Sequence, residues 1–114
     1  MRKLDGEQVL MRIFIGESDR WEHRPLHAAL VEMLRARGLA GATVLRGVAG
    51  FGANSVVHTA NILRLSADLP LVIEVVDTQE HVDRVLPEVD RMMSGGLVTL
   101  EKVRVLKYDR TPSS

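Results

Sequence analysis

The segment Gly41-Ala-Thr-Val-Leu-Arg-Gly-Val-Ala-Gly-Phe-Gly52 is the most informative part of the chain, because a strand-like run in it opens into a glycine-rich turn. Residues 42–49 predict a strand, which Gly50-Phe51-Gly52 ends. Such a turn exposes backbone N–H groups that can contact a phosphate directly. The long segment 53–67 follows, and a long loop in a small domain is usually functional or mobile. We therefore expect a mobile loop whose base binds a small anionic ligand. The alternative is that the glycines serve only a bulge and a tight turn.

The composition indicates one globular domain. Of 114 residues, 46% are hydrophobic, and 15 basic residues balance 15 acidic ones. This length supports a single core, here built from aliphatic side chains. Nucleic-acid binding needs a basic surface, so the balanced charge does not favour it. The absence of cysteine excludes disulfides and thiolate chemistry, and no apolar run is long enough to span a membrane. We expect a cytoplasmic protein that is not embedded in a membrane.

The hydrophobic pattern predicts the order strand, helix, strand, long loop, strand, helix, strand, strand. The expected strands are 9–15, 42–49, 69–76, 97–100 and 103–108, and the expected helices run from Pro25 to Gly38 and from a Thr78 cap to Gly95. Pro87 should kink or divide the second helix. The alternation changes phase at Glu101-Lys102, which predicts a turn or bulge there. Residues 1–8 and 109–114 are expected to be tails around a single domain, 9–108.

This order predicts an α+β, ferredoxin-like (split βαβ) fold. Two helices would cover one face of an antiparallel sheet, and an extra C-terminal strand would follow. Because the predicted strands are apolar on both faces, the face without helices would expose a large hydrophobic surface. Burial of that surface between copies in a symmetric homo-oligomer is the simplest solution.

Four segments make the chain resemble the PII-like superfamily, and within it an uncharacterised domain-of-unknown-function branch related to the nitrogen-regulatory PII signalling proteins. They are Ile15-Gly-Glu-Ser-Asp19, Gly41-Ala-Thr-Val44 with Gly50-Phe-Gly52, Asp68-Leu-Pro-Leu-Val-Ile-Glu-Val-Val-Asp77, and Gly96-Leu-Val-Thr-Leu-Glu-Lys-Val103. The resemblance implies a homotrimer that binds an adenine nucleotide in clefts between subunits. It also implies a protein partner, for which a membrane transporter is one candidate, contacted through the long loop.

The resemblance also implies a set of nucleotide-binding residues. They are Gly50, Phe51, Gly52 and Ala53 at the loop base, Gly95 and Gly96 in a second turn, and Arg104 and Lys107 as sources of charge. PII proteins use two arginines on alternate positions of their last strand, whereas Arg104 and Lys107 would lie on opposite faces of a regular strand. At most one of them can therefore point as that pair does, which favours AMP or ADP over ATP. In the loop, His58 and Arg64 are expected to contact the partner.

Two other functions compete with this hypothesis. His23 and His27 are four residues apart, a spacing that metal ligands use on helices, and Glu17 and Asp19 lie nearby. This pattern would suit a divalent-metal-binding or metal-tolerance trimer of the CutA type. However, Pro25 lies between the histidines, so His23 is expected to precede the regular helix. For Asp19 the competing interpretation is a turn in which it bonds local backbone. The serines lack a nucleophile-elbow pattern, so we expect no enzyme.

Overall fold

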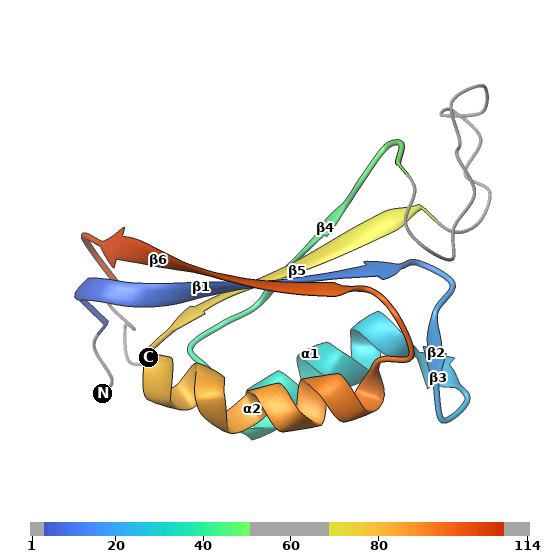
Figure 1. The fold of residues 1–114 in the computed structure, drawn as a ribbon, viewed down its shortest axis with the longest axis horizontal. Helices are drawn as coiled ribbons and strands as arrows, with labels where there is room; N and C mark the ends of the chain where they lie inside the picture. The colour runs from blue at the N-terminus through green and yellow to red at the C-terminus, as the bar shows by residue number, and fades with distance from the viewer. Residues whose placement is uncertain (1–3, 51–68, 109–114) are drawn as a thin grey trace, which may run out of the picture.

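The computed structural model describes residues 4–50 and 69–108. Its elements are β1 (Gly6–Gly16), β2 (Arg20–Trp21), β3 (Arg24–Pro25), α1 (Leu26–Ala36), β4 (Thr43–Arg46), β5 (Pro70–Asp77), α2 (Gln79–Met92) and β6 (Leu97–Val105). The four long strands form an antiparallel sheet in the order β4-β5-β1-β6. Both helices cover the same face of this sheet (Figure 1). The predicted α+β, ferredoxin-like fold is confirmed.

The core lies between the sheet and the two helices. In β5 every second residue is buried, so Leu71, Ile73 and Val75 face the helices while their neighbours face the other side. Fully burying an aliphatic side chain of this kind stabilises the fold by about 1.5–3 kcal/mol. The helices contribute Leu30 and Val89, both completely buried, to the same cluster. The helix layer and the sheet therefore share one continuous core.

Both helices begin and end near the predicted residues. Pro25 precedes α1, and the N–H of Gly38 donates to the carbonyl of Arg35 at the C-terminal end. Thr78 caps α2, because its hydroxyl accepts the N–H of His81 at 3.1 Å. Pro87 does not divide α2, which continues from Gln79 to Met92. Of the predicted kink or division, the division was wrong, because a proline removes one backbone hydrogen bond while the buried face of α2 continues on both sides of it.

The expected turn at Glu101-Lys102 was wrong, and β6 is one continuous strand. Glu101 pairs with Leu10 and Lys102 with Val9, so the ladder with β1 holds both residues extended. The phase change begins at Lys102, because Lys102 and Arg104 lie on the helix side of the sheet but are exposed there, while Val103 and Val105 lie on the face without helices. Glu101 lies on the face without helices, and its carboxylate accepts a hydrogen bond from Arg12 at 2.7 Å. In the described part of the chain β6 is the last strand, so the predicted extra strand is the second half of β6.

Two predicted strand boundaries also move. β1 begins at Gly6, inside the segment expected to be a tail, and Leu4 before it is buried. β4 ends at Arg46, because the N–H of Gly47 makes the last hydrogen bond to β5, to the carbonyl of Pro70 at 2.7 Å. Beyond Gly47 the chain leaves the sheet. The C-terminal tail 109–114 lies outside the described residues.

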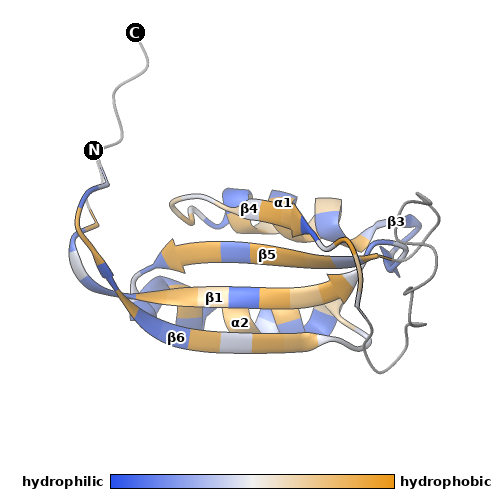
Figure 2. Ribbon diagram, turned by 90° about the horizontal axis from the view of Figure 1, so that it is seen from above, coloured by the Kyte–Doolittle hydropathy of each residue, from blue (hydrophilic) through white to orange (hydrophobic). Residues whose placement is uncertain are grey.

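The face without helices, here called the open face, carries hydrophobic and polar rows across the strands (Figure 2). The register places Leu45, Val72, Phe14 and Leu97 side by side in one row. Leu97 and Leu45 remain 56% and 47% exposed. In the polar part, Arg12 donates to Glu74 at 3.0 Å and to Glu101. The hydrogen bond to Glu74 is the main cause that raises the pKa of the Arg12 guanidinium, which keeps its charge.

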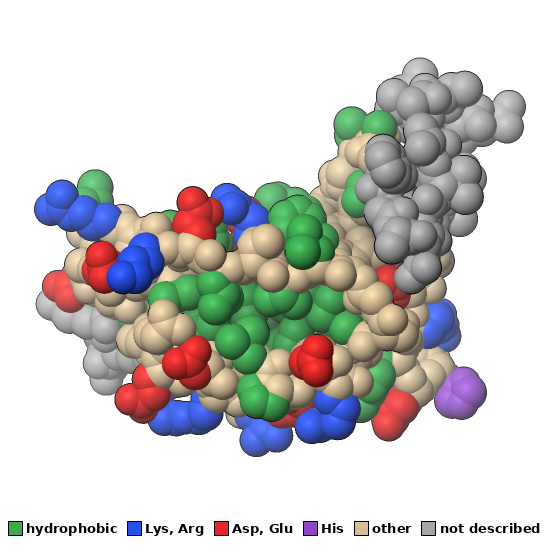
Figure 3. Space-filling model, viewed as in Figure 1, with side chains coloured by type: hydrophobic (Ala, Val, Ile, Leu, Met, Phe, Trp, Pro, Cys, Tyr) green, Lys and Arg blue, Asp and Glu red, His purple; other side chains and the backbone are tan. Residues whose placement is uncertain are grey.

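The β6 edge of the helix layer is also incompletely covered. Figure 3 shows a band of hydrophobic side chains between β6 and α2. Leu100 is 43% exposed in β6, and the partly buried Val98 and Leu86 pack against the core. A four-stranded sheet with only two helices therefore leaves hydrophobic surface on the open face and along one edge.

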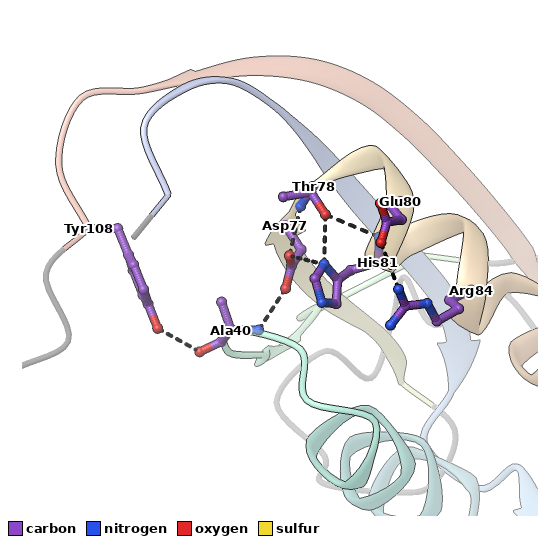
Figure 4. Close-up of polar contacts among 7 residues, drawn as sticks. All are labelled: Ala40, Asp77, Thr78, Glu80, His81, Arg84 and Tyr108. Carbon is purple, nitrogen blue, oxygen red and sulfur yellow. Dashed lines mark hydrogen bonds and ion pairs between the residues drawn. The ribbon is translucent and has the colours of Figure 1, made fainter. Parts of the chain in front are cut away.

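The buried carboxylate of Asp77, the last residue of β5, lies where the α1–β4 connection, the start of α2 and the chain after β6 meet (Figure 4). Asp77 is 0% exposed and accepts the backbone N–H of Ala40 at 2.8 Å and of Thr78 at 2.7 Å. Its Oδ1 lies 3.5 Å from Nδ1 of His81. The hydroxyl of Tyr108 donates to the carbonyl of Ala40 at 3.1 Å. Asp77 thus links the α1–β4 connection to the start of α2, and Tyr108 ties the chain after β6 to the same point.

Candidate functional site

The base of the long loop is formed where β1 ends, β4 ends and β5 begins, on the right in Figure 1. Gly16 pairs with Pro70, and Arg46 with Leu71, so the three strand ends lie at one end of the sheet. The N–H of Glu17 donates to the carbonyl of Leu69 at 2.8 Å. The described residues on either side of the predicted loop therefore both lie at this end of the sheet.

The glycines after β4 have a packing role as well as a conformational one. A Cβ at Gly47 would lie 2.7 Å from Cγ of Pro70, so a side chain there would force the two segments apart. Gly50 has a φ of +151°, a region that favours glycine. The N–H of Gly47 is already bonded to Pro70. At Gly47 a side chain is therefore excluded by the close approach of Pro70.

Several residues predicted at this loop lie outside the described residues. They are Phe51, Gly52 and Ala53 at the loop base and His58 and Arg64 farther along. Their predicted roles stay predictions.

The second glycine turn lies at the same end of the sheet but at its opposite edge. Gly95 and Gly96 are exposed and directly precede β6, whose first residue pairs with Phe14. From β4 to β6 there are three strand spacings, or about 14 Å. Gly96 has a φ of +103°, and a Cβ there would lie 2.5 Å from the carbonyl oxygen of Phe14. Within one chain, this turn faces the same end as Gly50 without touching it.

The two predicted cations lie at the other end of the sheet. Arg104 pairs with Glu7 near the start of β1, and Lys107 follows the end of β6. Eight residues of extended strand separate Gly96 from Arg104, which corresponds to roughly 27 Å. Arg104 lines a cavity of about 450 Å³, and Lys107 lines a different cavity of about 490 Å³ beside Tyr108. One chain therefore does not bring these cations to the glycine turns.

Arg46 is a cation at the same end of the sheet as the glycine turns, and it was not among the predicted site residues. Arg46, the last residue of β4, directly precedes Gly47, and its Nη2 lies 2.9 Å from Oε1 of Glu17. Asp19 closes the turn after β1, because its Oδ2 accepts the N–H of Gly16 at 3.0 Å. This confirms the backbone-bonding interpretation of Asp19. A signal for Arg46 existed, since it is the only charged residue in the segment 41–52.

The two histidines considered as metal ligands occupy different elements. His23 lies in the tight turn between β2 and β3, with a φ of +66°, and His27 lies in the first turn of α1. The expectation that His23 precedes the helix is confirmed. Among residues 4–50 and 69–108, no three His, Cys, Asp or Glu side chains come close enough to hold a metal ion. No helix in these ranges is long and apolar enough to cross a membrane.

Comparisons with known proteins agree with this fold. Residues 8–105 match the model of the DUF190 family, described as "Uncharacterized ACR". A UPF0166 protein of Aquifex aeolicus (strain VF5) is 38% identical over 100 residues, which cover 88% of this chain and 94% of that protein.

Two solved structures share the architecture. One is assigned to the PII-like signaling proteins and comes from Thermus thermophilus, with a TM-score of 0.61, 18% identity, and coverage of 90% of this chain and 93% of that one. The other is CPII of Thiomonas intermedia K12 bound to ADP and bicarbonate, with a TM-score of 0.59, 16% identity, and coverage of 89% and 90%. At these identities the likeness concerns the fold. The chain therefore belongs to the DUF190 family, an uncharacterised branch with the PII-like fold.

Proposed function

We propose that this protein is a cytoplasmic, non-enzymatic regulator of the PII type. It binds an adenine nucleotide, AMP or ADP in preference to ATP, in clefts between the subunits of a homotrimer, and it acts on a protein partner through residues 53–67. The main support is that one chain holds the candidate site residues apart. The glycine turns lie at one end of the sheet, and Arg104 and Lys107 lie at the other. Only neighbouring copies can unite these groups. The ADP in CPII, which has the same fold, supports the choice of ligand.

The open face supports the assembly. It exposes Leu45 and Leu97 in one hydrophobic row. Hydrophobic surfaces of this kind commonly mark interfaces. The polar row formed by Arg12, Glu74 and Glu101 would fix how the copies orient, because charged groups at an interface must find complementary partners. In the proposed trimer, the glycine turns of one sheet and the Arg104 end of a neighbouring sheet would meet in one cleft.

The placement of the two cations supports the preference for AMP or ADP. Arg104 and Lys107 line different cavities of one chain. A monophosphate or diphosphate needs fewer positive partners than a triphosphate.

Isothermal titration calorimetry with AMP, ADP and ATP tests this function. Arg104→Ala and Lys107→Ala each remove one exposed positive charge, and whichever residue faces the nucleotide should lose about 1.5–3 kcal/mol of binding, or roughly 10- to 150-fold in affinity. Arg84→Ala is the matched control, because Arg84 lies exposed on α2, lines neither of the two cavities and donates to the carboxylate of Glu80 at 2.7 Å. Equal affinities in all variants would place the ligand elsewhere. No nucleotide binding by the wild type would contradict the proposed function.

A further inference from the structure

Glu17 contacts both strands that flank the long segment. Its N–H donates to the carbonyl of Leu69, directly before β5, at 2.8 Å. Its carboxylate accepts a hydrogen bond from Nη2 of Arg46, the last residue of β4, at 2.9 Å. Backbone and side chain of one residue therefore hold the two strand ends to the end of β1.

Arg46 is positioned to recognise an anion near the glycine turn. Its guanidinium belongs to the residue before Gly47, and an arginine fork matches a phosphate as well as it matches a carboxylate. The other acidic group of this turn, Asp19, is occupied by the backbone N–H of Gly16. The positive charge of Arg46 is thus balanced in this structure by the carboxylate of Glu17.

The ion pair is open to competition. The side chains of Arg46 and Glu17 are 41% and 32% exposed, so water and solutes reach both. Exposed pairs of this kind stabilise a fold only slightly. A phosphate that also contacts the neighbouring backbone can therefore displace the Glu17 carboxylate at small cost.

We propose that Arg46 binds the phosphate of the nucleotide and that Glu17 occupies Arg46 in the free protein. This inference rests on the proposed function and specifies how its site works. On binding, the guanidinium exchanges the Glu17 carboxylate for the phosphate. The N–H of Glu17 still holds Leu69, while the side-chain link to β4 is released. Ligand occupancy thereby changes the connection between the two strands that flank the long segment.

Calorimetry with AMP and ADP on single variants tests the exchange. Glu17→Gln removes the competing charge, so affinity should rise, by up to about fivefold, which is the equivalent of the roughly 1 kcal/mol upper value for an exposed pair. Arg46→Gln should lower affinity by about 10- to 150-fold, as expected for the loss of a charge-assisted contact. The double variant should bind as weakly as Arg46→Gln, because Glu17 acts only through Arg46.

The matched control is Glu80→Gln. Glu80 makes the same change of charge, and its exposed carboxylate on α2 likewise accepts a hydrogen bond from an arginine, Arg84, at 2.7 Å. A general effect of lost negative charge would raise the affinity equally in Glu17→Gln and Glu80→Gln, and the exchange predicts a rise only in the first. If the wild type binds nucleotide but Glu17→Gln binds no better than Glu80→Gln, the exchange is overturned and the proposed function stands. If the wild type binds no nucleotide, both are overturned together.

Discussion

Replacing Asp77 by alanine should destabilise the fold strongly. The carboxylate is 0% exposed and accepts two backbone N–H groups, those of Ala40 and Thr78. Hydrogen bonds to a charged group contribute about 1.5–3 kcal/mol each, so losing both should cost about 3–6 kcal/mol. The whole stability of a domain is only about 5–15 kcal/mol. We therefore expect Asp77→Ala to lower the melting temperature by roughly 12–25 °C, at about 4 °C per kcal/mol.

Urea and thermal unfolding at a fixed protein concentration measure this effect, since stability is linked to assembly. Asp77→Asn keeps one acceptor oxygen and should lose roughly half as much, about 1.5–3 kcal/mol. Asp83→Ala is the matched control, because Asp83 lies exposed on α2 and accepts only an exposed hydrogen bond from Gln79. It should change stability by no more than about 0.5 kcal/mol. If Asp77→Ala unfolds like Asp83→Ala, the buried carboxylate does not hold this junction together.

Gly96→Ala should cost at least about 2 kcal/mol in urea unfolding, because the φ of +103° is strained for alanine and its Cβ would clash with the Phe14 carbonyl; unchanged stability would mean that the turn relaxes freely. Leu97→Asp should shift the assembly toward smaller species in analytical ultracentrifugation, because a charge would enter the hydrophobic row of the open face. Sedimentation identical to that of the wild type would show that this row lies outside the interface.

Much of the fold could be predicted from periodicity and capping residues. The helix predicted from Pro25 to Gly38, the Thr78 cap and the strand predicted over 69–76 rest on local signals, and the structure confirms them. The break in β6 was predicted wrongly because the hydrophobic alternation changes face after Glu101. The strand nonetheless continues, because β1 begins as early as Gly6 and pairs with β6 as far as Val105. This pairing depends on a different strand, so the local sequence pattern does not reveal it.

The candidate site was predicted less completely for the same reason. The glycines that follow the predicted strand 42–49 are a local signal, and two of them, Gly47 and Gly50, follow the end of β4. The Glu17–Arg46 pair joins residues 29 positions apart and depends on the β1–β5–β4 pairing. The separation of Gly96 from Arg104 likewise follows from the continuity of β6. Strand register therefore determines which site residues one chain can bring together.

Native mass spectrometry of the wild-type protein with ADP decides whether the nucleotide site forms between subunits, because it reports assembly and ligand occupancy in the same species. We predict a trimer that carries up to three nucleotides and no nucleotide on any residual monomer, since a single chain separates the glycine turns from Arg104 and Lys107. A monomer that binds ADP, or a trimer that binds none at saturating ADP, would contradict this prediction.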